Sequence, residues 1–443
     1  MNPELRRLPL RVEDSLRHSR MVRESLAQLL GLAGGLAASL RKRCQFTMRA
    51  LEATENATYR ARLVRRLNAW DAFTKRDLWL DLARTSPRYQ SQYKHRMTLG
   101  RSIILKAPST NGEKGALLMT FEYNWARLFL GLDPTGLAWV NEHFNLILST
   151  SWSPTDYSML ALAVSCIPER LFVQSCNYDE CAAIEAMHPR LRCLKTLPCD
   201  WIDPSGFQGK PFKDRSIDLL MVANFGEFKR HWEFFQMLTK MPTNLKVVLI
   251  GQRSGKRNKE FIERMAREHG VKQQLMVYES LDIEEVLAMQ CDSKVSIIMT
   301  RREGCCVAAV ESMMAGCALA MRDDAHVGPK AYINAHTGRL LRPDHLVEDL
   351  LCLLKEADKL DPRGWCLTHA CHSRSQKLLN EQLRSHEIEE GRQWTSGIIL
   401  PRWYPHPTFA RPEEQQAMKP IYDELHARFP SVFAANLRME SWR

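Results

Sequence analysis

Short apolar runs alternate with amphipathic stretches from residue 101 to about residue 341. Such runs are typical of buried strands, and the longer stretches between them are typical of helices. The alternation predicts parallel sheets covered by helices, because each parallel strand needs a crossover connection to reach its neighbour. We expect strands in two series, at 103–107, 116–121, 146–149, 171–174 and 194–197, and then at 217–223, 246–250, 275–278, 294–299, 318–321 and 338–341.

The chain of 443 residues is too long for one ordinary core, so we expect more than one domain. A segment rich in Pro, Gly and Asp at 198–207 is typical of a chain leaving one domain for the next. The sequence thus predicts two tandem doubly wound, Rossmann-like α/β domains, whose strand ends would face a shared cleft. The predicted parts are 1–100, a basic helical extension; 101–203, an acceptor domain; 204–373, a donor domain; and 374–443, a helix and tail packing back across both.

The positive charge of the chain is concentrated at its N-terminal end. Residues 1–100 hold 20 Lys and Arg against 9 Asp and Glu, a balance of +11 that equals the formal charge of the whole chain. Helical spacing predicts helices at 60–70 and 71–82, and an apolar run at 26–40 ends in Arg41-Lys42-Arg43. Three interpretations stay open: an arm packed on the body, an interfacial helix on an anionic membrane, and, with least support, a nucleic-acid contact.

Cysteine use and hydropathy favour a cytoplasmic protein. The 13 cysteines are odd in number and irregularly spaced, which suits a reducing compartment. We expect no signal peptide and no spanning helix, because no run of about 18 apolar residues occurs. Attachment to the inner face of a membrane through residues 1–50 is the expected exception to a freely cytoplasmic location.

One loop and helix, residues 301–316, carries the clearest chemistry. Glu303 lies just before the expected helix and Glu311 about two turns into it, and Gly316 is the expected C-terminal glycine. The helix N-terminus between the two glutamates presents free N–H groups and the positive end of the helix dipole. Carboxylates can hold sugar or ribose hydroxyls while the amides hold phosphate, so this arrangement suits a nucleotide-sugar.

Two further loops are expected to reach the same edge of the second sheet. Residues 222–231 contain Lys229, which we expect to open a helix and to neutralise a diphosphate beside that helix's amides. Ile250-Gly251 ends an apolar strand, and Arg253 follows it.

At these residues the chain resembles glycosyltransferase family 4, the glycosyl transferases group 1 class with a GT-B fold. The family pattern has an arginine and, five residues later, a lysine; here Asn224 and Lys229 stand at those positions. The Ile-Gly strand end is matched by Ile250-Gly251, and the Glu-x7-Glu motif by Glu303 and Glu311. The resemblance covers about residues 195–345 well, 101–195 weakly, and the first 100 residues not at all.

The resemblance implies a role for each matched residue. Lys229 would contact the donor phosphates, Glu311 the ribose hydroxyls and Glu303 the transferred sugar. Donor contacts are also implied for the amides of the loop, at Gly304, Cys305, Cys306 and Val307.

The chain departs from the family pattern in two places. Asn224 cannot neutralise phosphate as the family arginine does, so Arg253, Arg230 or Arg302 is expected to substitute for it. The histidine that often follows a first-domain strand in the family is missing here.

The implied reaction is transfer of a sugar from a nucleotide-diphosphate sugar to a hydroxyl acceptor, with retention of anomeric configuration. No metal and no other cofactor is expected, since lysine and helix dipoles would stabilise the leaving diphosphate. A glycan or a lipid-linked glycan is the expected acceptor, and nucleic acid is not. Alternatives are a GT-B-fold epimerase or hydrolase of nucleotide-sugars and a non-catalytic carbohydrate-binding or scaffold protein.

Three residues of the first domain are candidates for the acceptor side. Glu122, Trp152 and Asp156 each follow an expected strand and would line the cleft. A core position is the competing interpretation for Trp152. The cysteine and histidine residues at 366–372 are too closely spaced for one segment to wrap around zinc, so we expect ordinary helix residues there.

Overall fold

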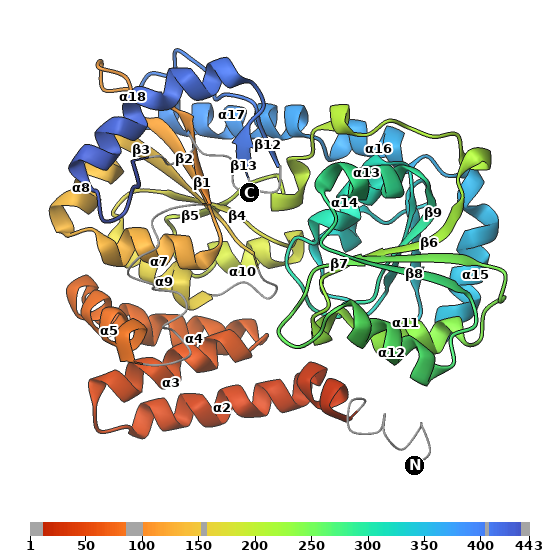
Figure 1. Cartoon of the computed structure of the whole chain (residues 1–443). Coiled ribbons are helices and arrows are strands. Elements are labelled where there is room, and N and C mark those ends of the chain that lie inside the picture. The colour runs from red at the N-terminus through yellow and green to blue at the C-terminus, as the bar shows by residue number, and fades with distance from the viewer. Residues whose placement is uncertain (1–11, 86–100, 152–156, 404–406, 436–443) are drawn as a thin grey trace. The chain divides into compact units, whose positions relative to one another are not determined.

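The computed structural model describes residues 12–85, 101–151, 157–403 and 407–435 (Figure 1). The chain divides into two compact units. We call residues 12–198 and 375–435 the N-terminal unit, and residues 199–374 the C-terminal unit. The domain boundaries drawn from the sequence stay predictions.

The N-terminal unit is built on a five-stranded sheet in the order β1-β2-β3-β4-β5. Strands β2 to β5 are parallel, and β1 pairs with β2 antiparallel. This antiparallel first pair differs from the all-parallel expectation, because the short turn after β1 returns the chain directly without a crossover helix. The strands are β1 (Ser102–Lys106), β2 (Gly115–Thr120), β3 (Phe144–Ser149), β4 (Leu171–Gln174) and β5 (Leu191–Cys193).

The fifth strand lies earlier in the chain than expected. The sequence predicted a strand at 194–197, but β5 ends at Cys193. Leu194 and Leu197 are buried beyond the strand, so their apolar character reflects the core and not sheet pairing.

Helices and the C-terminal tail cover this sheet. Tail residues contact the sheet: Tyr422 accepts a hydrogen bond from the backbone N–H of Ile104 in β1 at 2.9 Å, and Glu387 accepts one from Asn145 in β3 at 3.0 Å. The covering elements are α7 (Glu122–Gly131), α8 (Pro134–His143), α9 (Tyr157–Cys166), α10 (Cys181–Glu185), α17 (His372–Glu389), the hairpin of β12 (Pro401–Trp403) and β13 (Pro407–Phe409), and α18 (Pro412–Arg428).

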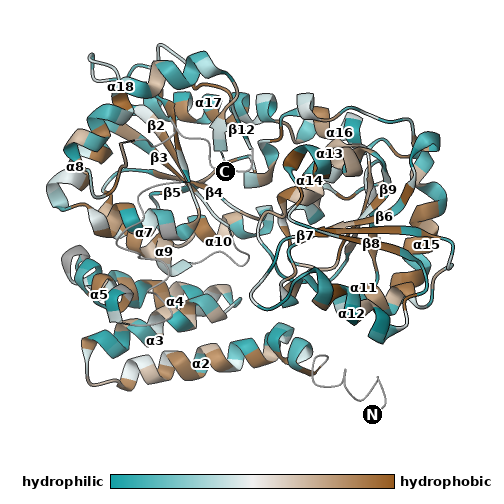
Figure 2. Cartoon of the chain, in the orientation of Figure 1, coloured by the Kyte–Doolittle hydropathy of each residue, from teal (hydrophilic) through white to brown (hydrophobic). Residues whose placement is uncertain are grey.

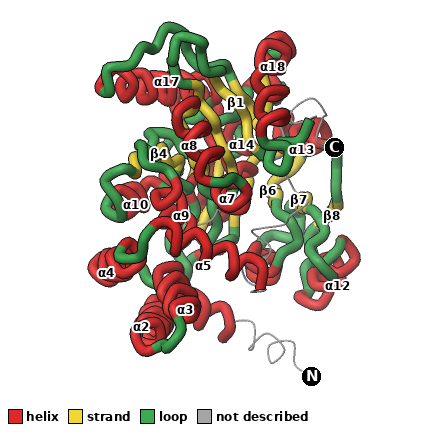
Figure 3. Tube along the Cα trace, turned by 90° about the vertical axis from the view of Figure 1, so that its left-hand side faces the viewer, coloured by secondary structure: helices red, strands yellow, loops and turns green. Residues whose placement is uncertain are grey.

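Four helices of the N-terminal extension form a layer beneath the sheet (Figures 1 and 3). Helices α3, α4 and α5 pack on α9, and α2 packs on α3. Eight of the ten residues of α9 are buried, which is typical of a helix apolar all round and covered on both sides. The helical extension therefore packs on the rest of the N-terminal unit through α9, in agreement with the first of the three interpretations of the basic extension. The four helices are α2 (Arg20–Leu36), α3 (Leu40–Ala53), α4 (Ala57–Asn68) and α5 (Ala72–Thr85).

The C-terminal unit holds a six-stranded sheet in the order β11-β10-β9-β6-β7-β8, with every pair parallel. This is the strand order of the Rossmann fold, so the predicted α/β class with two Rossmann-like units and a helical extension is confirmed. The strands are β6 (Ile217–Val222), β7 (Lys246–Gly251), β8 (Gln274–Glu279), β9 (Ser293–Ile298), β10 (Ala318–Arg322) and β11 (Gly338–Leu341).

Apolar side chains fill both faces of this sheet. One face buries Leu219, Leu249 and Ile297 against helices, and the other buries Leu220 and Val248. Strands apolar on both faces explain why the sequence showed continuous runs and not alternation. The surrounding helices are α11 (His231–Leu238), α12 (Lys259–His269), α13 (Ile283–Cys291), α14 (Val307–Met314), α15 (Leu346–Glu356) and α16 (Pro362–His369).

No helix among the described residues is both long and apolar enough to cross a bilayer.

Candidate functional site

The candidate site lies where the strand order of the C-terminal sheet reverses. Strands β6 and β9 are neighbours there, and the crossovers that follow them lead to opposite sides. Sheets of this kind bind ligands outside the carboxyl ends of the strands at that point. The loop after β6 carries Lys229, and the loop after β9 carries Glu303.

Lys229 and Glu303 are brought together although 74 residues separate them in the chain. The Lys229 ammonium donates to Glu303 Oε1, and the two side chains retain only 9% and 15% of their exposure. Burial alone would lower the pKa of Lys229, but the neighbouring Glu303 carboxylate raises it above its ordinary value. The lysine is thus held as a cation at this sheet edge.

The local structure at Lys229 differs from the expected helix start. Residues Glu227–Lys229 form a 3₁₀ turn, Arg230 has a left-handed backbone with φ 60°, and α11 begins at His231. The lysine thus precedes α11 by two residues, and its ammonium pairs with Glu303 from the loop after β9.

The second oxygen of Glu303, Oε2, is buried and lacks a hydrogen-bond donor among the described residues. A buried carboxylate oxygen without a donor is costly, and a sugar or ribose hydroxyl could supply the missing hydrogen bond.

His231 is a residue that sequence reasoning missed. Its side chain is buried, and neither ring nitrogen has a hydrogen-bond partner in the part of the chain that the structure describes. Burial, aided by Arg257 and Lys229, lowers the pKa of His231 to about 3, so the ring is neutral. The one sequence feature that could have indicated a site role for His231 is its position two residues after Lys229. A core histidine is equally compatible with that position, and in the structure the ring packs edge-on against Phe225.

The loop between Glu303 and α14 presents the helix N-terminus. Gly304 is buried, and its carbonyl accepts from Gly328 N at 3.1 Å, which ties the loop to the next one. Cys306 occupies the N-cap with a left-handed φ of 39°, no side chain caps the helix, and Val307 opens it. Burial raises the pKa of the Cys306 thiol to about 12, which agrees with a structural and not a nucleophilic cysteine. Cys305 is partly exposed.

Glu311 lies one turn into α14 and is partly buried. Burial raises the pKa of its carboxyl to about 7, and a hydrogen bond from Gln290 opposes that rise. Around neutral pH the group therefore exists in both protonation states, and either state can hydrogen-bond a hydroxyl.

Two other predicted donor residues, Asn224 and Arg253, form hydrogen bonds with backbone atoms two residues away. The Asn224 side chain turns back and accepts from Gly226 N at 3.0 Å. The exposed Arg253 donates to Gly255 O at 3.2 Å. At Gly251 an added Cβ would lie 2.3 Å from Ala223 O, so glycine is required where β7 meets the loop after β6.

Arg230, one of the arginines considered as substitutes for Asn224, belongs to a network of ion pairs with Arg301 and Arg322. Arg230 pairs with Glu233 at 3.0 Å, and Arg322 bridges Glu233 at 2.7 Å and Asp324 at 2.8 Å. Arg301 joins the same chain of charges through Asp324 at 3.1 Å. This network fixes the loop after β9 to the start of α11, and so orients the loops that carry Lys229 and Glu303.

The predicted acceptor residues are only partly described. The Glu122 carboxylate begins α7 and accepts from the N–H of Ser151 at 2.9 Å and from its hydroxyl, so it ties β3's loop to this helix. Trp152 and Asp156 lie outside the described residues. The acceptor roles of all three stay predictions.

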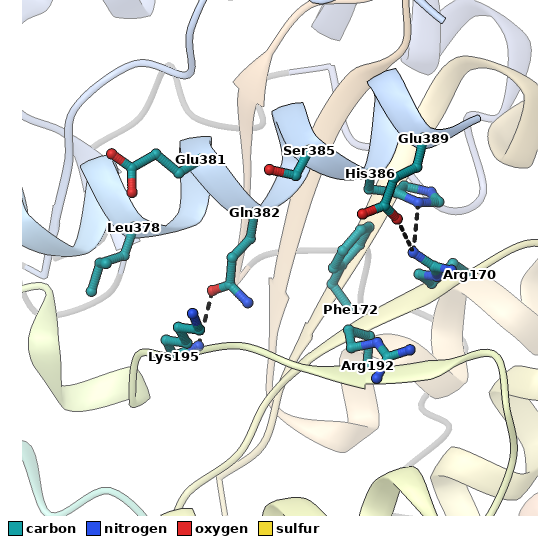
Figure 4. A pocket seen from close by; sticks show the side chains of 10 residues that line it. All are labelled: Arg170, Phe172, Arg192, Lys195, Leu378, Glu381, Gln382, Ser385, His386 and Glu389. Carbon is teal, nitrogen blue, oxygen red and sulfur yellow. Dashed lines mark hydrogen bonds and ion pairs between the residues drawn. The ribbon is translucent and has the colours of Figure 1, made fainter. Parts of the chain in front are cut away.

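A hollow of about 440 Å³ lies in the N-terminal unit between α17 and strands β4 and β5 (Figure 4). Arg170, Arg192 and Lys195 line it beside Glu381 and Glu389, and none of the predicted site residues contributes to it. In Figure 4 the Arg170 guanidinium points to the His386 ring, to which it donates at 3.0 Å.

No group of three or more His, Cys, Asp or Glu side chains within the described ranges is arranged to hold a metal ion. In the 366–372 segment, burial raises the pKa of the Cys366 thiol. Independence from metal stays a prediction.

Comparison with known proteins finds a family likeness in the second half of the chain. Residues 205–362 match the sequence model described as "Glycosyl transferases group 1". A search of curated protein sequences finds no match.

Similar solved structures share little sequence with the chain. Sucrose-phosphate synthase from Thermosynechococcus elongatus is 12% identical, with a TM-score of 0.48 over 62% of this chain and 74% of that one. TarM is 11% identical, with a TM-score of 0.47 over 60% of this chain and 54% of that one. The pneumococcal O-GlcNAc transferase GtfA, in complex with UDP and GlcNAc, is 11% identical, with a TM-score of 0.43 over 57% and 54%.

The chain thus spans about half the length of TarM and GtfA. The family match covers β6 to β11, with the loops that carry Lys229, Glu303 and Glu311. The likeness to the glycosyl transferases group 1 family is therefore confined to residues 205–362, which hold the candidate site.

Proposed function

We propose that this protein is a retaining glycosyltransferase of the GT-B class. It would transfer a sugar from a nucleotide-diphosphate sugar to a hydroxyl of a glycan or lipid-linked acceptor, in polysaccharide or glycoconjugate synthesis. The observation that carries the proposal is the Lys229–Glu303 pair at the switch point of the C-terminal sheet, next to the N-terminus of α14. The family match over the same residues supports it.

The geometry suits the charges that such a transfer develops. Departure of the diphosphate builds negative charge on its oxygens, and a fixed cation with helix amides stabilises that charge without reorganisation. Lys229 is such a cation because it is buried and held protonated. Glu303, through its unpartnered Oε2, would hold the sugar, and Glu311 would hold the ribose. We propose that no metal takes part.

Because His231 is neutral, it would add no second positive charge beside Lys229. Its unpartnered nitrogens lie near Lys229, and burial prevents protonation at any ordinary pH. A neutral ring can accept from or donate to a ligand without repelling the lysine.

A nucleotide-binding panel tests the donor. The thermal unfolding of the full chain would be followed with UDP, GDP, ADP and TDP. A nucleotide at 100 times its Kd should add about 2.7 kcal/mol of stability. If none of the four raises the melting temperature, the donor assignment fails.

Product analysis distinguishes the proposal from its alternatives. Incubation of the labelled donor with and without glycan acceptors should give acceptor-dependent product with retained configuration. Donor conversion that needs no acceptor favours the epimerase or hydrolase alternative. Nucleotide binding without any conversion favours a non-catalytic protein, which the engaged Asn224 at the arginine position would explain.

We also propose that residues 1–50 make peripheral contact with an anionic membrane surface, since the helical extension of residues 1–100, of which they are part, carries a balance of +11.

A further inference from the structure

Helix α2 is packed with its small residues inward. The residues it buries are Ala27, Gly31 and Gly34. A Cβ added at Gly31 would lie 1.7 Å from the hydroxyl of Tyr59, so the Tyr59 side chain lies directly against the backbone of α2. A helix in a globular protein ordinarily turns its large apolar residues to the core, and α2 does the opposite.

Hydrogen bonds from α4 fix this orientation. Tyr59 donates its hydroxyl to Ala27 O at 3.3 Å, and Arg66 donates to Gly31 O at 2.8 Å. Glu24 accepts from the Thr54 hydroxyl at 2.7 Å and from the following backbone amides. The inward face of α2 is therefore held by polar and close-packed contacts, and a rotation that buried the leucines would break them.

The outward face of α2 is mainly apolar, although the exposed Ser25 and Gln28 also lie on or beside it. The exposed residues of this face follow helical spacing, and Leu29, Leu32 and Leu36 are 66%, 62% and 87% exposed. Figure 2 shows α2 largely in the hydrophobic colour at the outer side of the helical layer. The leucine face, as we name it, comprises Met21, Val22, Leu26, Leu29, Leu32 and Leu36.

Charged residues lie at the two ends of the leucine face and not on it. The charged residues of α2 itself are Arg20, Arg23 and Glu24, all in its first turns. Beyond its C-terminal end the exposed cations Arg41, Lys42 and Arg43 begin α3, and Arg43 donates to Ala37 O at 2.7 Å. Arg23 pairs with Glu55 and Arg41 pairs with Asp81, which leaves Arg20, Lys42 and Arg43 to meet anionic headgroups. An apolar face with such cations near its ends is complementary to an anionic lipid surface, whose acyl boundary would take the leucines.

We propose that the leucine face of α2 is a membrane-docking surface that inserts into the headgroup and acyl boundary of an anionic bilayer, with α2 lying in the plane of the membrane. A helix of 17 residues is about 25 Å long, and most of this length would contribute to insertion. Helix α2 lies far from the donor loops in sequence, and vesicle binding involves no nucleotide or sugar chemistry, so either proposal can fail without the other.

The test is co-sedimentation of the full-length protein with vesicles of phosphatidylcholine, either alone or containing about 30% phosphatidylglycerol. The variant Leu29→Ser/Leu32→Ser places two hydroxyls in the centre of the leucine face. Leu367→Ser is the matched control, because Leu367 is also an exposed leucine, at 42%, but lies in α16. Circular dichroism and the melting temperature confirm that each variant is folded.

We expect the wild type and Leu367→Ser to bind anionic vesicles alike and to bind neutral vesicles at least tenfold more weakly. Leu29→Ser/Leu32→Ser should bind anionic vesicles at least tenfold more weakly than the wild type. Lys42→Gln should weaken binding about fivefold, and so should raised salt, as expected for a cation near an anionic surface.

Three results would overturn the proposal. The first is a wild type that binds no vesicle, and the second is a leucine-face variant that binds as well as the wild type. The third is a wild type that ignores vesicles but forms a dimer that Leu29→Ser/Leu32→Ser dissociates, which would assign the leucine face to a second copy of the chain.

Discussion

Replacement of Lys229 by methionine, alone and together with Glu303→Gln, separates what the ion pair contributes to stability from what Lys229 contributes to nucleotide binding. Methionine keeps the unbranched shape of the side chain, is one heavy atom shorter, and removes the charge together with its hydrogen-bond donors. Because both side chains are largely buried, the change leaves an uncompensated carboxylate at Glu303. Breaking a buried pair on one side costs about 3–5 kcal/mol, and the remaining solvent access places the expected loss of unfolding free energy near 3 kcal/mol.

The double variant Lys229→Met/Glu303→Gln removes both charges. Its unfolding free energy should return to within about 1 kcal/mol of the wild type, since no buried charge is left unpaired. Its affinity for a nucleoside diphosphate should not return. A charge-assisted hydrogen bond to phosphate is worth about 1.5–3 kcal/mol, which corresponds to roughly a 10- to 150-fold rise in Kd.

Calorimetric titration with the best nucleotide of the four and denaturant unfolding of each variant measure these two quantities. Lys240→Ala is the matched control, because Lys240 is an exposed lysine just beyond the C-terminal end of α11. It should change neither stability nor affinity. A double variant that binds nucleotide as tightly as the wild type would refute the assignment of Lys229 to the phosphates.

Three further predictions concern the same unit. Burial raises the pKa of Glu311 to about 7 from 4.5, so its ionisation lowers the stability of the folded state as the pH rises from about 4.5 to 7. Glu311→Gln should therefore be more stable than the wild type by roughly 1–3 kcal/mol at pH 7.5 but by little at pH 4.5. A difference in denaturant unfolding that does not change with pH would contradict this. Gly251→Ala places a Cβ against Ala223 O and the Phe225 ring and should lower the free energy of unfolding by about 1–3 kcal/mol. In the control Gly209→Ala the added Cβ meets nothing within 4 Å, so its free energy of unfolding should stay within about 0.5 kcal/mol of the wild type. Equal urea midpoints for the two variants would be evidence against the close approach at Gly251. Asn224→Arg restores the family arginine at an exposed position and should lower the Kd for the preferred nucleoside diphosphate about tenfold, and an unchanged or weaker titration would show that this position does not reach the phosphates.

The sequence predicted the C-terminal sheet better than the N-terminal one. Strands β6 to β11 are apolar on both faces and separated by helices, so their positions followed from the runs alone. In the N-terminal unit, Leu194 and Leu197 are buried without pairing in the sheet, which is why β5 was placed too late. The antiparallel β1–β2 pair depends on a turn that apolar patterning does not register.

The convergence of Lys229 and Glu303 was predictable in outline, because the loops after two adjacent parallel strands share an edge. Their direct pairing was not predictable, because it depends on the 3₁₀ turn and on the left-handed backbone of Arg230. No local sequence pattern requires that conformation of an arginine. The burial of both nitrogens of His231 and the network through Arg322 depend on tertiary packing. The orientation of α2 was likewise hidden, because a sequence with leucines and glycines on opposite faces does not say which face meets the body.

The position of α9 between the first sheet and the N-terminal helices decides how this protein can be shortened for experiments. A version that started at the first strand would leave a nearly all-apolar helix open to water along one side. Such a patch favours aggregation in a truncated protein. Residues 12–85 should therefore be kept in expression work on the N-terminal unit, and questions about membrane contact are better asked with point substitutions on α2 than with deletions.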